Sequence, residues 1–316
     1  GPDIRRKMAQ FCNVETSSVI EAIDAESIYD VPLLLLKERL DAVVISKLHL
    51  RDTKEPNLNS WKNFLGKLKN PLHEVKIGLI GKYNELPDAY KSIYESFVHA
   101  GAVNECKVQV VPIHAEDLEG SYKDVGKTLA PFNGILVAPG FGERGIEGKL
   151  SAIRYARENN VPFFGICLGM QTACVEFARN VLNLSGASST EVNPNTSHPI
   201  IAMMEEQKKV TQKGGTMRLG AYPCEVKKKS KAHAAYGTAL ISERHRHRWE
   251  FNNAYLEQFE KAGFVATGIN PESNLVEIME LKDHKWFVGV QFHPELKSTV
   301  ENPHPLFAAF VKASMG

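Results

Sequence analysis

Residues 165–169 have the sequence Gly-Ile-Cys-Leu-Gly, which places a candidate nucleophile, Cys167, between two glycines. Residues 161–166 form an apolar run typical of a buried strand, and residues 168–182 have the pattern of a helix. The sequence therefore predicts a nucleophile elbow, in which a strand turns sharply into a helix and the glycines leave room for the turn. Because a helix N-terminus stabilises negative charge, Cys167 is predicted to be a reactive thiolate and not a structural cysteine.

The sequence Gln-Phe-His-Pro-Glu at residues 291–295 contains the groups that a cysteine nucleophile needs. A base must take up the thiol proton and later protonate the leaving group. The segment ends an apolar run typical of a strand, and residues two apart on a strand point the same way. We therefore predict that His293 faces Cys167 and that Glu295 orients and supports the imidazole. Taken alone, the segment would more often be a capping histidine and a surface glutamate; the cysteine motif favours a triad.

An acyl-transfer site also needs N–H donors for the oxyanion that forms on the substrate carbonyl. The second glycine-rich strand end, Pro-Gly-Phe-Gly at residues 139–142, is the candidate for one side of such an oxyanion hole. Pro139 has no N–H, so Gly140 has to supply the donor. Its predicted partner is the N–H of Leu168 at the start of the helix. An ordinary loop is the alternative for residues 139–142.

Strands and helices alternate along the chain from residue 75 onward. Strands are predicted at 75–81, 107–113, 134–138 and 161–166, and helices at 90–101, 148–159 and 168–182. This alternation predicts an α/β fold with a mostly parallel central sheet and helices on both faces. Ligands in such sheets bind beyond the carboxyl ends of the strands, where Cys167 and Gly140 both fall. Later elements are predicted as a helix at 252–262 with an asparagine cap, strands at 264–267, 275–281 and 286–292, and a helix at 305–313.

The composition of the chain changes at two places. Residues 1–50 contain short apolar pieces that predict helices and strands, with a buried run at 42–45. Residues 51–74 are polar and predict a linker with one short helix, and residues 75–316 carry the candidate chemistry. The lysine-rich segment 226–231 predicts a solvated turn.

The overall composition is that of an ordinary globular protein of 316 residues, with 43% hydrophobic and 24% charged residues. The net charge of +1 gives no indication of a nucleic acid or an anionic membrane as partner. No apolar run approaches the roughly 20 residues of a membrane span. Five scattered cysteines favour free thiols in a reducing compartment, which predicts a cytoplasmic location. His245 and His247 alternate in a basic segment, but no third ligand is placed, so no metal site is expected.

The cysteine elbow, the glycine-rich loop and the His-Pro-Glu segment together resemble the class I (triad) glutamine amidotransferases, which have a flavodoxin-like fold. The resemblance is closer still to the CTP synthase family and covers essentially the whole chain. Seven segments carry it: Phe-Cys-Asn-Val (11–14), Ser-Ile-Tyr-Asp-Val-Pro (27–32), Gly-Lys-Tyr-Asn-Glu-Leu-Pro-Asp-Ala-Tyr-Lys-Ser (81–92), Cys-Leu-Gly-Met-Gln (167–171), Gly-Gly-Thr-Met-Arg-Leu-Gly (214–220), Glu-Arg-His-Arg-His-Arg-Trp-Glu (243–250) and Gln-Phe-His-Pro-Glu (291–295).

The resemblance implies roles for the residues that match the family's motifs. One set would hold the glutamine side chain and the oxyanion: Gly140, Leu168, Gly169, Met170 and Gln171. Glu191 would bind the α-amino group of glutamine, and Arg248 would bind its carboxylate through a bidentate contact. Without the resemblance, Glu191 would be interpreted as a solvated loop residue and Arg248 as a surface ion pair. Lys7 and Asp24 match positions at which the family contacts nucleotide.

The resemblance also implies a destination for the ammonia. Residues 75–316 would be the glutamine amidotransferase domain, and residues 1–50 would be the end of the amidoligase (synthetase) domain. In the family, ammonia from L-glutamine passes through a channel to UTP, which is activated by ATP and Mg²⁺, and CTP is formed. GTP is the allosteric activator, and the full-length enzyme is a homotetramer.

This chain has no Gly-x-x-x-x-Gly-Lys-Ser/Thr phosphate-binding motif. We therefore expect it to hydrolyse glutamine at best, without a cofactor of its own, and to form no CTP by itself. The resemblance implies that full-length relatives assemble through the missing half, so we expect this chain to be monomeric. Where the family usually has Pro-Gly-Gly-Phe-Gly, residues 138–142 are Ala-Pro-Gly-Phe-Gly, and we expect activity to survive this change.

Two alternatives remain open from the sequence. Another class I amidotransferase, or a γ-glutamyl hydrolase, would keep the triad but has no reason to keep the segments 214–220 and 243–250. A non-catalytic module that senses glutamine would have no need for an intact Cys-His-Glu set. Ammonia release from glutamine by the native chain and by Cys167→Ala, with and without GTP, distinguishes these possibilities.

Overall fold

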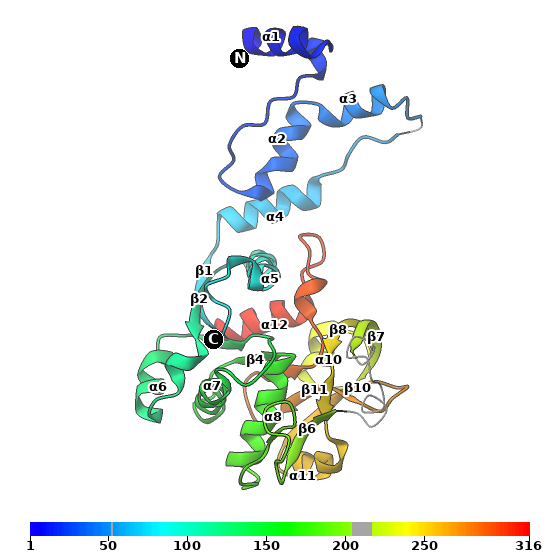
Figure 1. Ribbon diagram of the computed structural model, residues 1–316. Helices are drawn as coiled ribbons and strands as arrows, with labels where there is room; N and C mark the ends of the chain where they lie inside the picture. Colours follow the sequence, from blue (N-terminus) through cyan, green and yellow to red (C-terminus); the bar gives the residue numbers. More distant parts are fainter. Residues whose placement is uncertain (52, 204–216) are drawn as a thin grey trace. The chain divides into compact units, whose positions relative to one another are not determined.

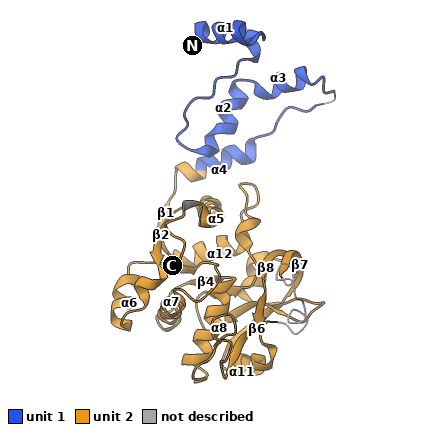
Figure 2. Ribbon diagram, in the orientation of Figure 1, with its two compact units in different colours: residues 1–66 blue, residues 67–316 orange. Residues whose placement is uncertain are grey.

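The computed structural model describes residues 1–51, 53–203 and 217–316, and these form two compact units (Figure 1). Unit 1 contains residues 1–66, and unit 2 contains residues 67–316 (Figure 2). The boundary falls within helix α4, Asn59–Lys69. No helix among the described residues is both long enough and apolar enough to cross a membrane.

Unit 1 is built from short helices around a small aromatic cluster. Its elements are α1 (Pro2–Cys12), α2 (Val31–Lys37), α3 (Leu40–Lys47) and the first part of α4. Tyr29 packs edge-on against Phe64 with ring centroids 5.0 Å apart, and the indole of Trp61 donates to the Tyr29 carbonyl at 2.7 Å. The prediction of strands was wrong for the part of unit 1 that the structure describes, and the apolar run 42–45 lies in α3, none of whose residues is buried. A run of four apolar residues fits a helix as well as a strand, which explains the error.

Unit 2 contains a nine-stranded sheet with the strand order β2-β1-β3-β4-β12-β11-β10-β7-β8. The first five are parallel: β2 (Cys106–His114), β1 (His73–Gly81), β3 (Gly134–Val137), β4 (Phe163–Ile166) and β12 (Phe287–Val290). The others extend the sheet in antiparallel fashion: β11 (Val276–Leu281), β10 (Phe264–Ile269), β7 (Arg218–Val226) and β8 (Leu240–His247). A small second sheet contains β5 (Ser188–Ser189), β6 (Pro199–Met203) and β9 (Trp249–Phe251).

Helices cover both faces of the large sheet, and each face has its own apolar core. One core includes residues of α6 (Tyr122–Leu129), α7 (Ile146–Glu158), α8 (Leu168–Asn180) and α11 (Leu256–Lys261). The other includes residues of α5 (Lys91–Val103), α10 (Lys231–Tyr236) and α12 (Pro305–Ser314). Neighbours on β4 alternate between the faces, as Phe163 stacks on Phe287 while Phe164 meets Phe307 edge-on. The predicted α/β fold class is confirmed.

Two later predictions can be compared with the structure directly. The helix predicted at 252–262 is divided into a 3₁₀ turn (Asn253–Tyr255) and α11, and the Asn252 side chain caps the turn by accepting from the Ala254 N–H. In the lysine-rich segment, Lys227, Lys228 and Lys229 are exposed, as predicted for a solvated turn.

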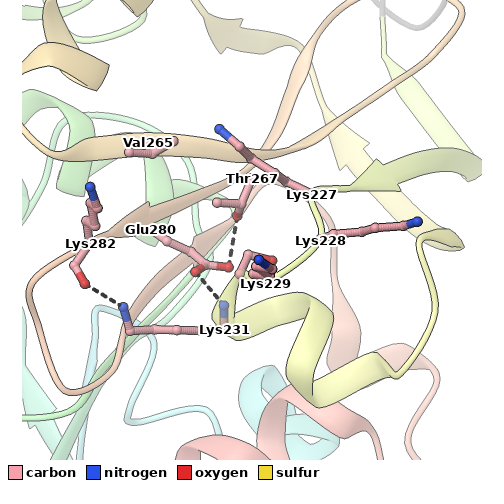
Figure 3. Close-up of a pocket in the computed structure, with 9 residues that line it drawn as sticks. Lys227, Lys228, Lys229, Lys231, Val265, Thr267, Glu280 and Lys282 are labelled. Atoms are coloured by element: carbon pink, nitrogen blue, oxygen red, sulfur yellow. Dashed lines mark hydrogen bonds between the residues drawn. The ribbon is translucent and has the colours of Figure 1, made fainter.

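The next lysine of that segment, Lys231, is a structural residue. Its ammonium donates to the carbonyls of Leu281 and Lys282, while the Glu280 carboxylate accepts the backbone N–H groups of Lys231 and Ala232. Figure 3 shows the contacts of Lys231 with Lys282 and Glu280. These contacts hold the start of α10 against β11, beside an open pocket of about 270 Å³.

Candidate active site

Cys167 lies between the end of β4 and the start of α8, in a backbone conformation that residues other than glycine rarely adopt. Its φ and ψ are 53° and −104°. The Cys167 N–H donates to the Val290 carbonyl at 2.7 Å, and its carbonyl accepts from Gln171 at 3.1 Å. These two bonds tie the strained residue to β12 on one side and to α8 on the other.

The glycines that flank Cys167 allow three elements to approach one another closely. A Cβ at Gly169 would lie 2.3 Å from the Val137 carbonyl oxygen of β3. A Cβ at Gly165 would lie 2.7 Å from the backbone carbon of Gly169. Neither glycine has a positive φ, so they serve close backbone packing at the elbow and not the turn conformation itself.

His293 and Glu295 form a hydrogen-bonded pair beside the nucleophile. The Nδ1 atom of His293 lies 2.7 Å from Oε1 of Glu295, and both residues are buried. Burial lowers the pKa of His293, but interactions with Cys167 and Glu295 outweigh it and raise the pKa to about 10. With Nδ1 engaged by Glu295, Nε2 is the nitrogen left to exchange a proton with the thiol.

The prediction that a strand aligns His293 and Glu295 was wrong. Strand β12 ends at Val290, and Pro294–Leu296 form a 3₁₀ turn. The backbone N–H of His293 donates to the Arg244 carbonyl at 2.7 Å, which anchors the segment at β8. The pair therefore meets across a turn, and the proline that begins this turn restricts its backbone.

The oxyanion loop, which we define as residues 138–144, runs beside the elbow. A Cβ at Gly140 would lie 3.5 Å from the Leu168 side chain and 3.0 Å from that of Lys82, so Gly140 is adjacent to the first residue of α8. Pro139, Gly140 and Phe141 line an open pocket of about 240 Å³ together with Cys167, His293 and Glu295. The structure thus brings together the three segments that the sequence suggested for catalysis.

Arg246 lines this pocket as well, and sequence reasoning passed over it. The burial of β8 alternates, with His245 and His247 buried and Arg244 and Arg246 exposed. The alternation of arginine and histidine at residues 244–247 was a usable signal, because successive residues of a strand face opposite sides of the sheet. Arg248, the residue suggested by the resemblance, lies half-buried between β8 and β9.

Two further candidates for the glutamine pocket are Glu191, which contacts the oxyanion loop, and Met170, which packs on β12. The Glu191 carboxylate accepts the Gly142 N–H at 2.9 Å, so this loop residue contacts the oxyanion loop. Met170 is fully buried, and its Cβ lies 3.0 Å from where a side chain at Gly289 would begin, so its side chain packs on β12. Any role of Met170 toward a substrate would be through its backbone.

Gln291 is a buried residue next to the nucleophile that sequence reasoning left without a role. Its Nε2 donates to the Cys167 sulfur at 3.7 Å, and its Oε1 accepts from Gln171 at 3.2 Å. Gln171 also donates to the Trp249 carbonyl at 2.9 Å. This chain of contacts connects the thiol to β9 of the second sheet. A polar glutamine directly after the apolar run 286–290, two residues before His293, was the available signal in the sequence.

His245 and His247 belong to a buried charged network. His245 Nδ1 lies 2.8 Å from His247 Nε2, and burial lowers the pKa of His245 to about 3. Arg218 contacts both Glu250 and Glu277, at 3.2 and 2.9 Å. Within the described ranges no group of three or more His, Cys, Asp or Glu side chains is placed to hold a metal ion. Residues 214–216 of the motif that includes Arg218 lie outside the described residues.

The other candidates are two residues of unit 1 and four further cysteines. Lys7 on α1 and Asp24 in a stretch without regular secondary structure are exposed residues of unit 1. Cys12 is exposed, whereas Cys106, Cys174 and Cys224 are buried free cysteines. Burial raises the pKa of the Cys174 thiol far above its usual value, so this cysteine of α8 is unreactive.

Comparison with known proteins agrees with this fold. Residues 85–313 match the family model of class-I glutamine amidotransferases, and residues 1–50 match that of the CTP synthase N-terminus. The chain belongs to the class I glutamine amidotransferase family.

Its relatives in this family are CTP synthases, which confirms the resemblance seen in the sequence. The CTP synthase of Cytophaga hutchinsonii is 66% identical over 312 residues, which are 99% of this chain and 58% of that protein. The CTP synthase of Chlorobaculum tepidum is 57% identical over 313 residues, 99% of this chain and 55% of that protein. A solved Trypanosoma brucei CTPS glutaminase domain with bound acivicin is 36% identical, covering 76% of this chain and 93% of that one, with a TM-score of 0.71. The chain thus spans little more than half the length of its curated relatives.

Proposed function

We propose that unit 2 hydrolyses glutamine with Cys167 as the nucleophile. The observation that carries this proposal is the strained elbow conformation of Cys167 beside the His293–Glu295 pair. The Cys167 thiolate attacks the side-chain carbonyl carbon of glutamine, and the N–H groups of Gly140 and Leu168 stabilise the oxyanion that forms. His293 donates a proton to the leaving nitrogen, which departs as ammonia, and a thioester remains.

The thioester is resolved by water at the same site. His293, now neutral, takes a proton from the water as it attacks the thioester carbonyl. The carbon–sulfur bond breaks, glutamate is released, and the thiolate–imidazolium pair is restored. The sum is glutamine and water giving glutamate and ammonia. Glu295 supports the charge on the imidazole throughout, because its carboxylate remains hydrogen-bonded to Nδ1.

Substrate recognition is assigned to groups around the oxyanion loop. Glu191 offers a second carboxylate oxygen for the α-amino group while its first holds Gly142. Arg248 is the proposed partner of the substrate carboxylate. The backbone of residues 168–171 would contact the amide side chain, since Gly169 leaves this part of α8 close to β3.

We also propose that the ammonia serves the amination of UTP to CTP in a longer protein. The match of residues 1–50 to the CTP synthase N-terminus supports this proposal, as does the identity to CTP synthases over 99% of the chain. In that setting ATP and Mg²⁺ would act at the synthetase domain, with GTP as activator and Lys7 and Asp24 as nucleotide contacts. A cytoplasmic homotetramer is part of the same proposal.

Ammonia release from glutamine, with and without GTP, tests the hydrolase proposal. We expect release by the native chain, none by Cys167→Ala, and unchanged release by the control Cys12→Ala, whose cysteine is exposed in unit 1. A diazo-ketone analogue of glutamine should label the native chain and Cys12→Ala at a single cysteine, and should not label Cys167→Ala. Equal ammonia release by the native chain and Cys167→Ala would exclude a cysteine hydrolase at this site.

A further inference from the structure

Two buried lysines hold the oxyanion loop by its carbonyl oxygens. The ammonium of Lys82, the residue directly after β1, donates to the carbonyls of Phe141, Gly142 and Arg144, the last two at 3.0 and 3.3 Å. The side-chain nitrogen (Nζ) of Lys149, on α7, donates to the Ala138 carbonyl at 3.0 Å. Four carbonyls of one seven-residue loop are therefore bound by two side chains that approach from neighbouring elements.

The burial of these lysines indicates that they have a specific task. Lys82 is 4% exposed and Lys149 is fully buried. Placing an ammonium group in a protein interior is unfavourable, and an apolar side chain would fill the same space without that penalty. Hydrogen bonds to backbone carbonyls offset part of the penalty, and they fix the loop in return.

The bonds lie on both sides of the proposed oxyanion donor. The peptide between Phe141 and Gly142 is held at both edges, since its carbonyl binds Lys82 and its N–H binds Glu191. The peptide before Pro139 is held by Lys149 through the Ala138 carbonyl. The N–H of Gly140 lies between these two fixed peptides, in a part of the loop where Pro139 restricts φ.

Reciprocal bonds fasten the far end of the loop to Lys82. The Arg144 guanidinium donates to the Lys82 backbone carbonyl at 2.6 Å, while the Arg144 carbonyl accepts from the Lys82 ammonium. Arg144 also pairs with Glu116 at 2.6 Å. The loop is thus attached to β1 through both the backbone and the side chain of one residue.

We propose that Lys82 is a positioning residue that holds the oxyanion loop, with Lys149 as its second support, so that the Gly140 N–H meets the developing oxyanion. This inference depends on the proposed glutamine hydrolysis. An oxyanion donor acts only when it is already oriented, because a mobile donor must be reordered during the reaction. Lysine suits the task since one ammonium carries three donors for three carbonyls.

The variant Lys82→Met tests this inference by keeping the length of the side chain and removing its donors. We expect kcat for glutamine hydrolysis to fall roughly 10- to 100-fold, somewhat less than the loss of a whole donor, with KM changed less than about threefold. Alkylation of Cys167 by iodoacetamide involves no oxyanion, so its rate should stay within about twofold of the native rate. The control Lys228→Met changes an exposed lysine of the turn after β7 and should leave hydrolysis and alkylation unchanged.

The outcomes separate a positioning role from a general disturbance. Native kcat in Lys82→Met would overturn the inference, and so would a parallel loss of hydrolysis and alkylation. If Lys82→Met does not fold, the variant Lys149→Met is the test. A kcat for Lys149→Met that is less than twofold below the native value overturns the inference, and a larger reduction supports it. If the native chain is alkylated at Cys167 but releases no ammonia, the proposed hydrolysis fails instead.

Discussion

The Nδ1 atom of His293 lies 2.7 Å from Oε1 of Glu295, and the two residues meet across a 3₁₀ turn. Glu295 is one of the groups that raise the pKa of His293, so it stabilises the protonated imidazole. Glu295→Gln is expected to lower kcat at least about 100-fold, with a smaller effect on KM. Steady-state ammonia release measures both values. The control is Glu272→Gln, which changes an exposed glutamate in a loop. Equal kcat values for Glu295→Gln and the native chain would contradict the triad.

Glu191 contacts the oxyanion loop through Gly142 and is proposed to bind the substrate amino group. Glu191→Gln keeps an acceptor for the Gly142 N–H but loses the charge, so KM should rise about tenfold or more with kcat nearly unchanged. Glu191→Ala loses both contacts and should lower kcat as well. Steady-state kinetics of the pair separates the two roles. An unchanged KM in Glu191→Gln would argue against amino-group recognition, and equal kcat values in both variants would argue against the loop contact.

Gly169 allows α8 to approach β3, because a Cβ there would lie 2.3 Å from the Val137 carbonyl oxygen. Gly169→Ala is expected to lower the free energy of unfolding by about 3 kcal/mol or more, since backbone atoms must move. Gly126→Ala in α6 is the matched control, because its Cβ would have 3.7 Å to its nearest neighbour. That variant should gain about 0.5–1 kcal/mol from helix propensity. Urea unfolding measures both, and comparable stabilities would refute the packing argument.

Lys149 should make stability depend on pH in a definite direction. Burial, assisted by Lys82, lowers its pKa from 10.5 to about 7, against opposing effects of Cys167 and Glu116. Between about pH 7 and pH 10.5 the unfolded chain holds a proton that the folded chain has released. The free-energy cost of burying a charged Lys149 is therefore complete below pH 7, and the free energy of unfolding rises as pH increases through this window.

Lys149→Met removes this pH dependence. The free energy of unfolding of the native chain minus that of Lys149→Met should increase with pH, by up to about 1.4 kcal/mol per pH unit. Urea unfolding at pH 7, 8 and 9 measures the difference. A difference that stays constant across these values would show that Lys149 remains charged in the folded chain.

Several features of the chain could be predicted from local sequence alone. The nucleophile elbow could be predicted, because the glycines around Cys167, the strand before it and the helix after it are neighbours along the chain. The fold class followed from alternating apolar strands and helices. The antiparallel half of the sheet was less predictable, because strand direction depends on which strand pairs with which.

The sequence by itself determined which residues could perform the chemistry, because nucleophile, base and glycine positions are encoded within a few residues. Only the tertiary structure decided how they are held. Gly142 and Glu191 are 49 positions apart, Lys82 and Phe141 are 59 apart, and Cys167 and Gln291 are 124 apart. Contacts over such separations arise from the order of strands in the sheet, which brings their carboxyl ends to one edge. The loop supports are therefore a property of the fold and not of any local motif.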